Sequence, residues 1–162
     1  MNNVYLSIGS NLGNRIINCK KSLREISRVS IITSLSSLYE TVPIGNSNQP
    51  RFINLAVSIN TRLSPPLLLR MIKKIEANIG RFKNEKWGPR IIDIDIIFYN
   101  NICINHSSLV IPHPSAHSRR FVLEPINEIA PNLIHPVLKR DITTLLKGVK
   151  QKQFIRKVGN IY

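Results

Sequence analysis

The chain has few acidic residues: 9 Asp and Glu stand against 23 Lys and Arg in 162 residues, a formal net charge of +14. Such an excess suits nucleic acid, an anionic membrane or small polyanionic substrates. The basic residues are spread along the whole sequence, which is also rich in Ile and Asn. We therefore attribute most of the charge to overall composition, and only the basic residues near a functional site to function.

Long apolar runs and cysteine pairs are also missing. No run approaches the roughly 20 apolar residues that span a bilayer, and the first residues lack the basic and apolar regions of a signal peptide. We expect a cytoplasmic protein that does not enter a membrane. Its two cysteines, Cys19 and Cys103, form no Cys-x-x-Cys pair, so we expect both to be reduced.

Two phosphate-binding motifs are absent from the first glycine-rich turn. Residues 4–8 alternate as a strand, and Gly9 to Asn14 follow without the Lys-Ser/Thr of a Walker loop or the spacing of a dinucleotide fold. The segment is better interpreted as a turn into a helix over residues 15–29. Asn14 is the expected N-cap of this helix.

The hydrophobic periodicity of residues 30–99 predicts three further strands and a second helix. Further strands are expected over residues 30–39, 52–60 and from 91 onward, and a second helix from Ser64 to about Asn78, ended by Gly80. The order strand, helix, strand, strand, helix, strand predicts an α+β ferredoxin-like sandwich. We expect one domain over residues 1–162, with a mainly antiparallel four-stranded core sheet and helices on one face.

The C-terminal third has weaker signals. We expect a short strand at 109–111, a short helix near 126–129, and one or two helical turns over 141–146 with Asp141 as cap. From Lys147 onward we expect a loosely held basic surface. The sequence thus predicts an irregular C-terminal extension.

The chemistry is concentrated between Lys86 and Tyr99. Asp93 and Asp95 are two apart on a predicted strand, so their side chains leave one face roughly 6.5 to 7 Å apart. Magnesium prefers carboxylate oxygens together with phosphate oxygens and water, so the pair is a candidate metal site. The alternatives are a half-buried strand that happens to carry two aspartates and, for Arg90, a simple salt bridge.

A second candidate feature lies on the strand over residues 52–60. Phe52 and Asn54 share one face, where an aromatic ring and an amide can stack on and hydrogen-bond a flat heterocycle. Ordinary packing across the sheet is the alternative.

Three segments carry a resemblance to a known family. Residues 8–15, residues 87–95, and Pro112-His113-Pro114 followed by residues 119–125 resemble, in order and spacing, the 6-hydroxymethyl-7,8-dihydropterin pyrophosphokinases. The resemblance implies a folate-pathway enzyme with the ferredoxin-like fold. It implies transfer of the pyrophosphoryl group of ATP to the hydroxymethyl oxygen of the pterin, with release of AMP. Two Mg²⁺ ions, two small-molecule substrates and a monomer without nucleic-acid or membrane partners are then expected.

The resemblance also implies roles for individual residues. Asp93 and Asp95 would hold the two magnesium ions. No residue is an obvious strong general base, and our own hypothesis is that Asp95, directly or through the metal, assists removal of the hydroxyl proton. The catalytic set would be Arg81, Arg90, Asp93, Asp95, His113 and Arg119. The ATP contacts would be Lys73, Glu76, Lys83, Lys86, Trp87, Arg90, Ile96, His113 and Arg119. The pterin contacts would be Thr41, Val42, Ile44, Phe52, Asn54, Trp87 and Phe121, with the two phenylalanines on either face of the ring.

Some positions depart from the family pattern, and two other functions compete. Lys83 and Lys86 replace arginines and so lose the planar fork that grips phosphate. Ser115 and Arg120 also differ from the typical residues.

A nucleic-acid-binding module on the same fold would carry sheet aromatics in an Arg/Lys-Gly-Phe-like motif, which is absent. A substrate-binding relic without turnover is the third hypothesis.

Overall fold

The computed structural model describes residues 1–45, 48–81, 88–150 and 153–162. Within these ranges strands and helices alternate in the predicted order up to residue 99 and then continue into further regular structure. The elements are β1 (Asn2–Ser10), α1 (Arg15–Ile26), β2 (Ile31–Leu35), β3 (Leu38–Thr41), β4 (Phe52–Thr61), α2 (Pro65–Ile79), β5 (Asp93–Tyr99), β6 (Ile104–His106), β7 (Leu109–Ile111), the 3₁₀ turn η1 (Ala116–Ser118), α3 (Arg120–Ile129), α4 (Ile142–Lys147) and β8 (Ile155–Gly159).

One antiparallel sheet organises the molecule. Its strands lie in the order β5-β1-β4-β3-β8, and β2 also pairs with β4. β1 is therefore flanked by β4 on one side and by β5 on the other, which brings the two strands with candidate functional residues onto one surface. The α+β class and the antiparallel core sheet are confirmed. Within the described residues the sheet has six strands instead of the predicted four, because one predicted strand is divided into β2 and β3 and because β8 joins the edge.

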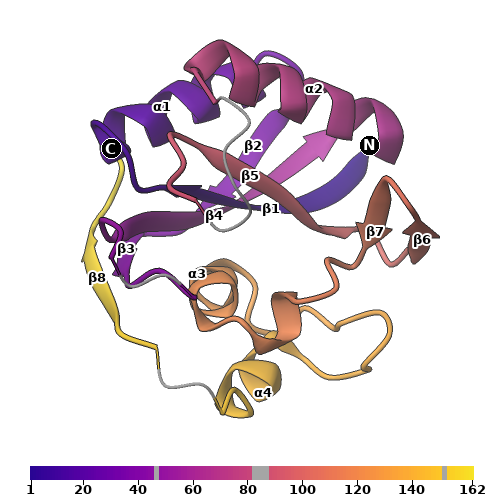
Figure 1. Ribbon diagram of the computed structural model, residues 1–162. Coiled ribbons are helices and arrows are strands. Elements are labelled where there is room, and N and C mark those ends of the chain that lie inside the picture. Colours follow the sequence, from indigo (N-terminus) through magenta and orange to yellow (C-terminus); the bar gives the residue numbers. More distant parts are fainter. Residues whose placement is uncertain (46–47, 82–87, 151–152) are drawn as a thin grey trace.

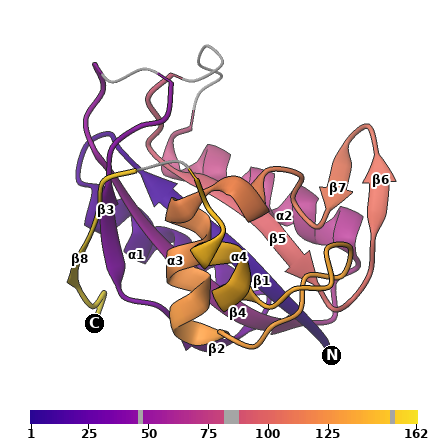
Figure 2. The same ribbon diagram turned by 90° about the horizontal axis from the view of Figure 1, so that it is seen from below.

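Helices cover both faces of the sheet. α1 and α2 lie on one face and α3 and α4 on the other, as both views show (Figures 1 and 2). Alternation along β1 explains the division, because Val4, Leu6 and Ile8 are buried in the core beneath α1 and α2. Ser7 and Gly9 point to the opposite face. The prediction of helices on one face is therefore correct for α1 and α2 but incomplete.

The predicted strand over residues 30–39 is interrupted. It is divided into β2 and β3 at Ser36 and Ser37, because these two side chains replace regular strand pairing with hydrogen bonds of their own. The Ser36 hydroxyl accepts from the Ala56 N–H at 2.9 Å, and the Ser37 hydroxyl donates to Glu128 at 2.7 Å.

The C-terminal region is more regular than predicted. α3 begins at Arg120 rather than near residue 126, and the loosely held surface expected after Lys147 contains β8. β8 pairs with β3, with Ile155 opposite Thr41. The prediction of an irregular extension was wrong because the partner of β8 lies far away in the sequence, where local patterns carry no information about it.

Helix termini follow the sequence signals. The Asn14 side chain accepts from the Ile17 N–H at 3.1 Å, and the Asp141 side chain accepts from the Thr144 N–H at 2.7 Å. Gly80 ends α2 in the left-handed conformation. In the part of the chain described here, no helix combines the length and the apolar character needed to cross a membrane.

Candidate active site

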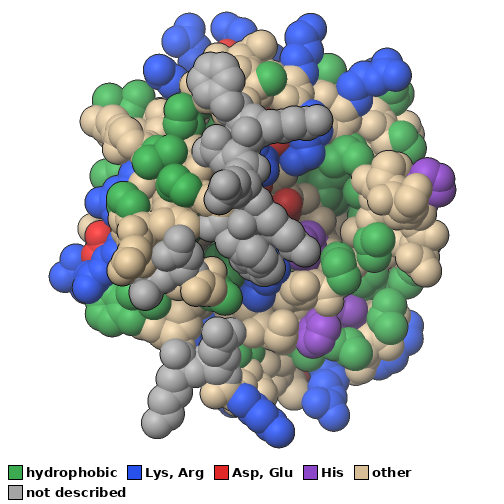
Figure 3. Space-filling view, viewed as in Figure 1, with side chains coloured by type: hydrophobic (Ala, Val, Ile, Leu, Met, Phe, Trp, Pro, Cys, Tyr) green, Lys and Arg blue, Asp and Glu red, His purple; other side chains and the backbone are tan. Residues whose placement is uncertain are grey.

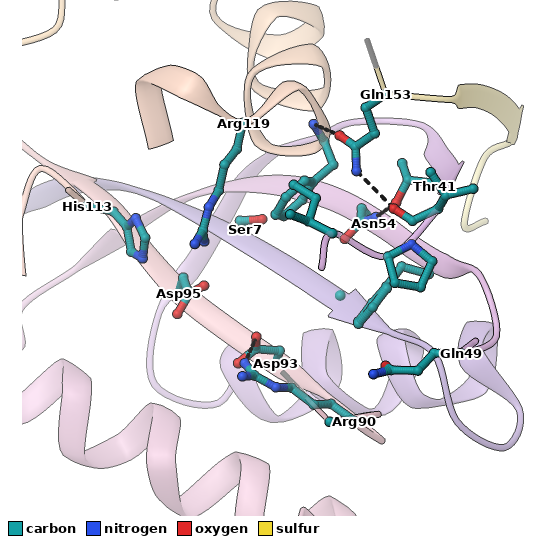
Figure 4. Close-up of a pocket in the computed structure, with 17 residues that line it drawn as sticks. Ser7, Thr41, Gln49, Asn54, Arg90, Asp93, Asp95, His113, Arg119 and Gln153 are labelled. Carbon is teal, nitrogen blue, oxygen red and sulfur yellow. Dashed lines mark hydrogen bonds and ion pairs between the residues drawn. The ribbon is translucent and has the colours of Figure 1, made fainter. Parts of the chain in front are cut away.

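A cavity of about 290 Å³ opens on the face of the sheet that carries α3 (Figure 4). It is bounded by β1, β3, β4 and β5, by the start of α3, and by the loops that follow β3 and precede β5. The residues that line it are Ser7, Gly9, Thr41, Val42, Pro43, Ile44, Gln49, Phe52, Asn54, Gly88, Arg90, Asp93, Asp95, His113, Arg119, Phe121 and Gln153.

The two aspartates of β5 point into this cavity from the same strand face, as predicted (Figure 4). Asp93 is paired with two arginines. Arg81 Nη1 lies 2.8 Å from its Oδ1, and Arg90 Nη1 contacts its Oδ2. The salt bridge considered as an alternative for Arg90 is thus present, and Arg90 lines the cavity as well.

Asp95 has a different environment. The described residues include no salt-bridge partner for its carboxylate. Burial raises the pKa of Asp95 to about 6, and the neighbouring charge of Asp93 adds to this effect, while Lys73 and Arg119 oppose it. A half-buried carboxylate beside a second carboxylate is an oxygen-rich pair that fits a hard divalent cation.

Beyond the two aspartates, the other ligands of a bound Mg²⁺ would be substrate phosphate oxygens and water. Among residues 1–45, 48–81, 88–150 and 153–162, no group of three or more His, Cys, Asp and Glu is arranged to hold a metal ion. Two carboxylates alone match the Mg²⁺ pattern in which substrate phosphates and water complete the coordination.

Glu76 lies behind the aspartates rather than in the cavity. It is 2 % exposed, and its carboxylate accepts from Arg81, from Lys73 Nζ at 2.8 Å and from the Ile94 N–H at 2.8 Å. Glu76 therefore connects α2 to β5 and orients Arg81 toward Asp93. Buried charges of this kind persist when they are paired and hydrogen-bonded, as here.

His113 and Arg119 enter the cavity from the segment between β7 and α3 (Figure 4). His113 Nδ1 accepts from the Ser115 N–H at 3.3 Å. Burial and the charge of Arg119 lower the pKa of His113, although Asp93 opposes them. Arg119 precedes the first turn of α3, and its guanidinium lies 5.8 Å from the ring centre of Phe121.

The opposite half of the cavity is aromatic and neutral. Phe52 and Phe121 both line it, and the buried Asn54 side chain donates to Thr41 Oγ1 at 2.7 Å. Gly9 makes this arrangement possible, because a Cβ at that position would lie 2.8 Å from Asn54 Oδ1. Stacking surface and amide hydrogen-bonding groups thus lie beside the charged half.

The structure gathers most of the predicted site residues but not all. All the predicted pterin contacts among the described residues line the cavity, as do Arg90, Asp93, Asp95, His113 and Arg119. Arg81, Lys73 and Glu76 lie outside its lining and form the ion-pair network behind Asp93. The Ile96 side chain is 5 % exposed and faces the core under α1 and α2, because it alternates with Asp95. Lys83, Lys86 and Trp87 lie outside the described residues.

Sequence reasoning missed several cavity residues. They are Ser7, Gly9, Pro43, Gln49, Gly88 and Gln153. Ser7 and Gly9 had a usable signal, because they alternate with the apolar residues of β1 and so face away from that core. Gln153 had none, since no local pattern placed its segment in the sheet.

The surface agrees with the interpretation of the net charge. On the face shown in Figure 3, lysine and arginine side chains are scattered around the periphery instead of forming one continuous patch. Only a few basic residues, such as Arg90 and Arg119, belong to the cavity.

Comparison with known proteins supplies independent information. The family model for 7,8-dihydro-6-hydroxymethylpterin-pyrophosphokinase (HPPK) matches residues 5–131. The 2-amino-4-hydroxy-6-hydroxymethyldihydropteridine pyrophosphokinase of Aquifex aeolicus is 40 % identical over 88 % of this chain and 89 % of its own. The folic acid synthesis protein FOL1 of Dictyostelium discoideum is 45 % identical over 85 % of this chain, which spans 21 % of that protein.

A solved structure agrees in fold. The crystal structure of wild-type Plasmodium falciparum HPPK-DHPS superposes with a TM-score of 0.72 at 21 % identity, over 91 % of this chain and 43 % of that one. The sequence match extends over most of the chain and includes the cavity residues of all four strands β1, β3, β4 and β5. The chain therefore belongs to the 7,8-dihydro-6-hydroxymethylpterin-pyrophosphokinase family of enzymes.

Proposed function

We propose that this protein transfers the pyrophosphoryl group of ATP to the hydroxymethyl group of 6-hydroxymethyl-7,8-dihydropterin, with Mg²⁺ as cofactor, in cytoplasmic folate biosynthesis. One observation carries the proposal. A neutral half with Phe52, Phe121 and Asn54 and a charged half with Asp93 and Asp95 adjoin in a single cavity. A flat heterocycle and a polyphosphate can then meet in one site.

The neutral half suits the pterin. Phe52 and Phe121 offer aromatic faces to a ring, and the Asn54 amide with backbone groups of Thr41, Val42 and Ile44 offers donors and acceptors along one edge. The fixed pair of Asn54 and Thr41 gives the amide one orientation, which favours a substrate of matching hydrogen-bonding pattern.

The charged half suits the triphosphate. Asp93 and Asp95 would hold the magnesium ions, which would supply charge neutralisation and alignment of the triphosphate. Arg90, Arg119 and His113 line the same region and would contact phosphate oxygens. Arg81, fixed between Glu76 and Asp93, would keep Asp93 in place.

The proposed reaction needs alignment more than a covalent nucleophile. The hydroxymethyl oxygen of the pterin attacks the β-phosphorus of ATP, the bond from that phosphorus to the α,β-bridging oxygen breaks, and AMP leaves. The hydroxyl proton is lost, and Asp95 remains our prediction for the residue that assists. Positioned cations and walls that restrict both substrates account for catalysis of this type.

The nucleotide product tests the proposal. With ATP, Mg²⁺ and 6-hydroxymethyl-7,8-dihydropterin, we expect AMP and the pterin diphosphate in equal amounts, measured by anion-exchange chromatography. Chelation of the metal with EDTA should stop the reaction, and added Mg²⁺ should restore it. Formation of ADP in place of AMP would exclude pyrophosphoryl transfer. Binding of both substrates without turnover would favour the alternative hypothesis of a substrate-binding protein that has lost catalysis.

A further inference from the structure

Gln153 brings the C-terminal segment into the cavity. It lies just before β8 and lines the site together with residues from β1, β3, β4, β5 and α3 (Figure 4). The pairing of Ile155 with Thr41 holds this segment beside the end of β3. The match to the family model ends at residue 131, so this wall of the cavity is formed by a part of the chain outside that match.

The Gln153 carboxamide joins two walls of the neutral half. Its Nε2 donates to the Val42 carbonyl oxygen at 3.0 Å, and its Oε1 accepts from the Phe121 N–H at 3.3 Å. Val42 follows β3, and Phe121 is the second residue of α3. One side chain therefore sets the separation between the loop after β3 and the helix that carries Phe121.

The bond to Phe121 meets a specific need of α3. The first N–H groups of a helix have no intrahelical acceptor, and a residue at the N-cap usually supplies one. Arg119 occupies the N-cap of α3 and makes no side-chain cap bond. Gln153 supplies the missing acceptor from a segment 32 residues further along the chain.

We propose that Gln153 is a positioning residue for the pterin, which fixes the distance between Val42 and Phe121. This inference rests on the proposed function, since it concerns the same cavity. The role requires a donor and an acceptor on one side chain of this length. Glutamate keeps the acceptor but loses the donor, and asparagine is shorter by one methylene.

Two variants separate positioning from simple capping. In Gln153→Ala both bonds are lost, and we expect the KM for the pterin to rise about tenfold, consistent with two hydrogen bonds of ordinary strength. In Gln153→Glu the carboxylate still accepts from the Phe121 N–H and suits the positive end of α3. We expect Gln153→Glu to have the melting temperature of the wild type but the raised pterin KM of Gln153→Ala. The KM for ATP should change less than twofold in both.

A control on β8 tests general loosening of the C-terminal segment. Lys157 Nζ contacts Glu128 Oε1 at 3.1 Å, and Lys157 does not line the cavity. Lys157→Ala should leave the KM for the pterin within twofold of the wild type. An equal rise in Lys157→Ala and Gln153→Ala would overturn the proposal, as would full recovery of the pterin KM in Gln153→Glu.

Direct binding keeps this inference distinct from the proposed function. Titration with 6-hydroxymethylpterin, followed by calorimetry, should show about tenfold weaker binding for Gln153→Ala than for the wild type. If the wild type forms AMP and both Gln153 variants keep its pterin affinity and KM, the positioning role is wrong and the proposed function stands. If the wild type forms no AMP, the proposed function is wrong, and the same titration still decides the role of Gln153.

Discussion

Asp93 and Asp95 share a strand face but differ in what surrounds them. Two arginines neutralise Asp93, whereas Asp95 is half-buried without a salt-bridge partner among the described residues, and its pKa is raised to about 6 by burial and by Asp93. A carboxylate kept ionised in such a place lowers stability, which is acceptable where a ligand compensates. The two residues should therefore respond differently to the same substitution.

Removal of either charge should abolish turnover. In Asp93→Asn and Asp95→Asn we expect kcat to fall at least about 10³-fold, because each substitution removes a proposed ligand of the metal that would align the reacting phosphates. Without metal, Asp95→Asn should raise the free energy of unfolding at pH 7, because it removes a half-buried charge whose pKa is raised by burial and by Asp93. Asp93→Asn should lower it, because two arginines lose their partner. Urea denaturation and the AMP assay measure both effects.

Asp141→Asn is the matched control for these variants. The chemical change is the same, but Asp141 caps α4 and does not line the cavity, and asparagine also caps well. Its kcat and stability should stay close to the wild type. Near-normal rates in the Asp93 and Asp95 variants would remove the aspartate pair from the mechanism.

At the scale of elements, Glu128 joins α3 to the sheet. Its carboxylate accepts from the Ser37 N–H at 3.1 Å, the Ser37 hydroxyl at 2.7 Å, the Tyr39 hydroxyl at 2.7 Å and Lys157 Nζ at 3.1 Å. Burial alone would raise the pKa of Glu128, but hydrogen bonds from Tyr39, Ser37 and Lys157 hold it below its usual value. One side chain thus holds β3, α3 and β8 together.

Glu128→Gln should destabilise the protein in a pH-dependent way. At pH 7 we expect the free energy of unfolding to fall by about 1–3 kcal/mol, the usual range for charged hydrogen bonds. Because the pKa of Glu128 is lower in the folded than in the unfolded protein, the ionised carboxylate stabilises the fold at pH values above the unfolded pKa of about 4.3. This stabilisation is lost as the pH falls through the folded-state pKa. The variant and wild-type stabilities should therefore converge below about pH 4, as measured by urea denaturation across pH.

A surface glutamate provides the comparison for this prediction. Among the described residues, Glu25 of α1 forms a salt bridge with the exposed Arg28 alone, just after the helix ends. Glu25→Gln should change the free energy of unfolding by less than about 0.5 kcal/mol at either pH. An equal loss in both variants, or a Glu128→Gln deficit that persists at low pH, would contradict the role assigned to Glu128.

At the scale of the whole molecule, the two cysteines report on folding. Both are free, with Cys19 on the buried face of α1 and Cys103 exposed beyond β5, as the sequence predicted for reduced residues. Burial raises the pKa of the Cys19 thiol to about 12, although Arg15 opposes the effect. A buried thiol with a raised pKa is a poor nucleophile.

Thiol labelling should therefore occur in two separate steps. With a disulfide reagent at pH 8, one thiol per chain should react quickly in the native protein, and the second at least about 10³-fold more slowly, through opening of the core. Cys103→Ser should remove only the fast step. Rapid reaction of both thiols in the native wild type would contradict the packing around Cys19.

Local sequence patterns predicted the first part of the fold well. Helix caps at Asn14 and Gly80 and strand alternation up to Tyr99 act over a few residues, so they can be read without the structure. The break at Ser36 and Ser37 could not, because it depends on a hydrogen bond to Glu128 on a distant helix. The same limit explains why β8 was missed.

By itself, the sequence determined that Asp93 and Asp95 share one face and that Phe52 and Asn54 share another, because alternation is a local property of any strand. The family resemblance added which chemistry to expect there. Only the tertiary structure decided that Asp93 has two arginine partners, that Ile96 faces the opposite core, and that Gln153 closes the cavity. These facts depend on contacts between residues far apart in the sequence, and such contacts are made only when the sheet assembles.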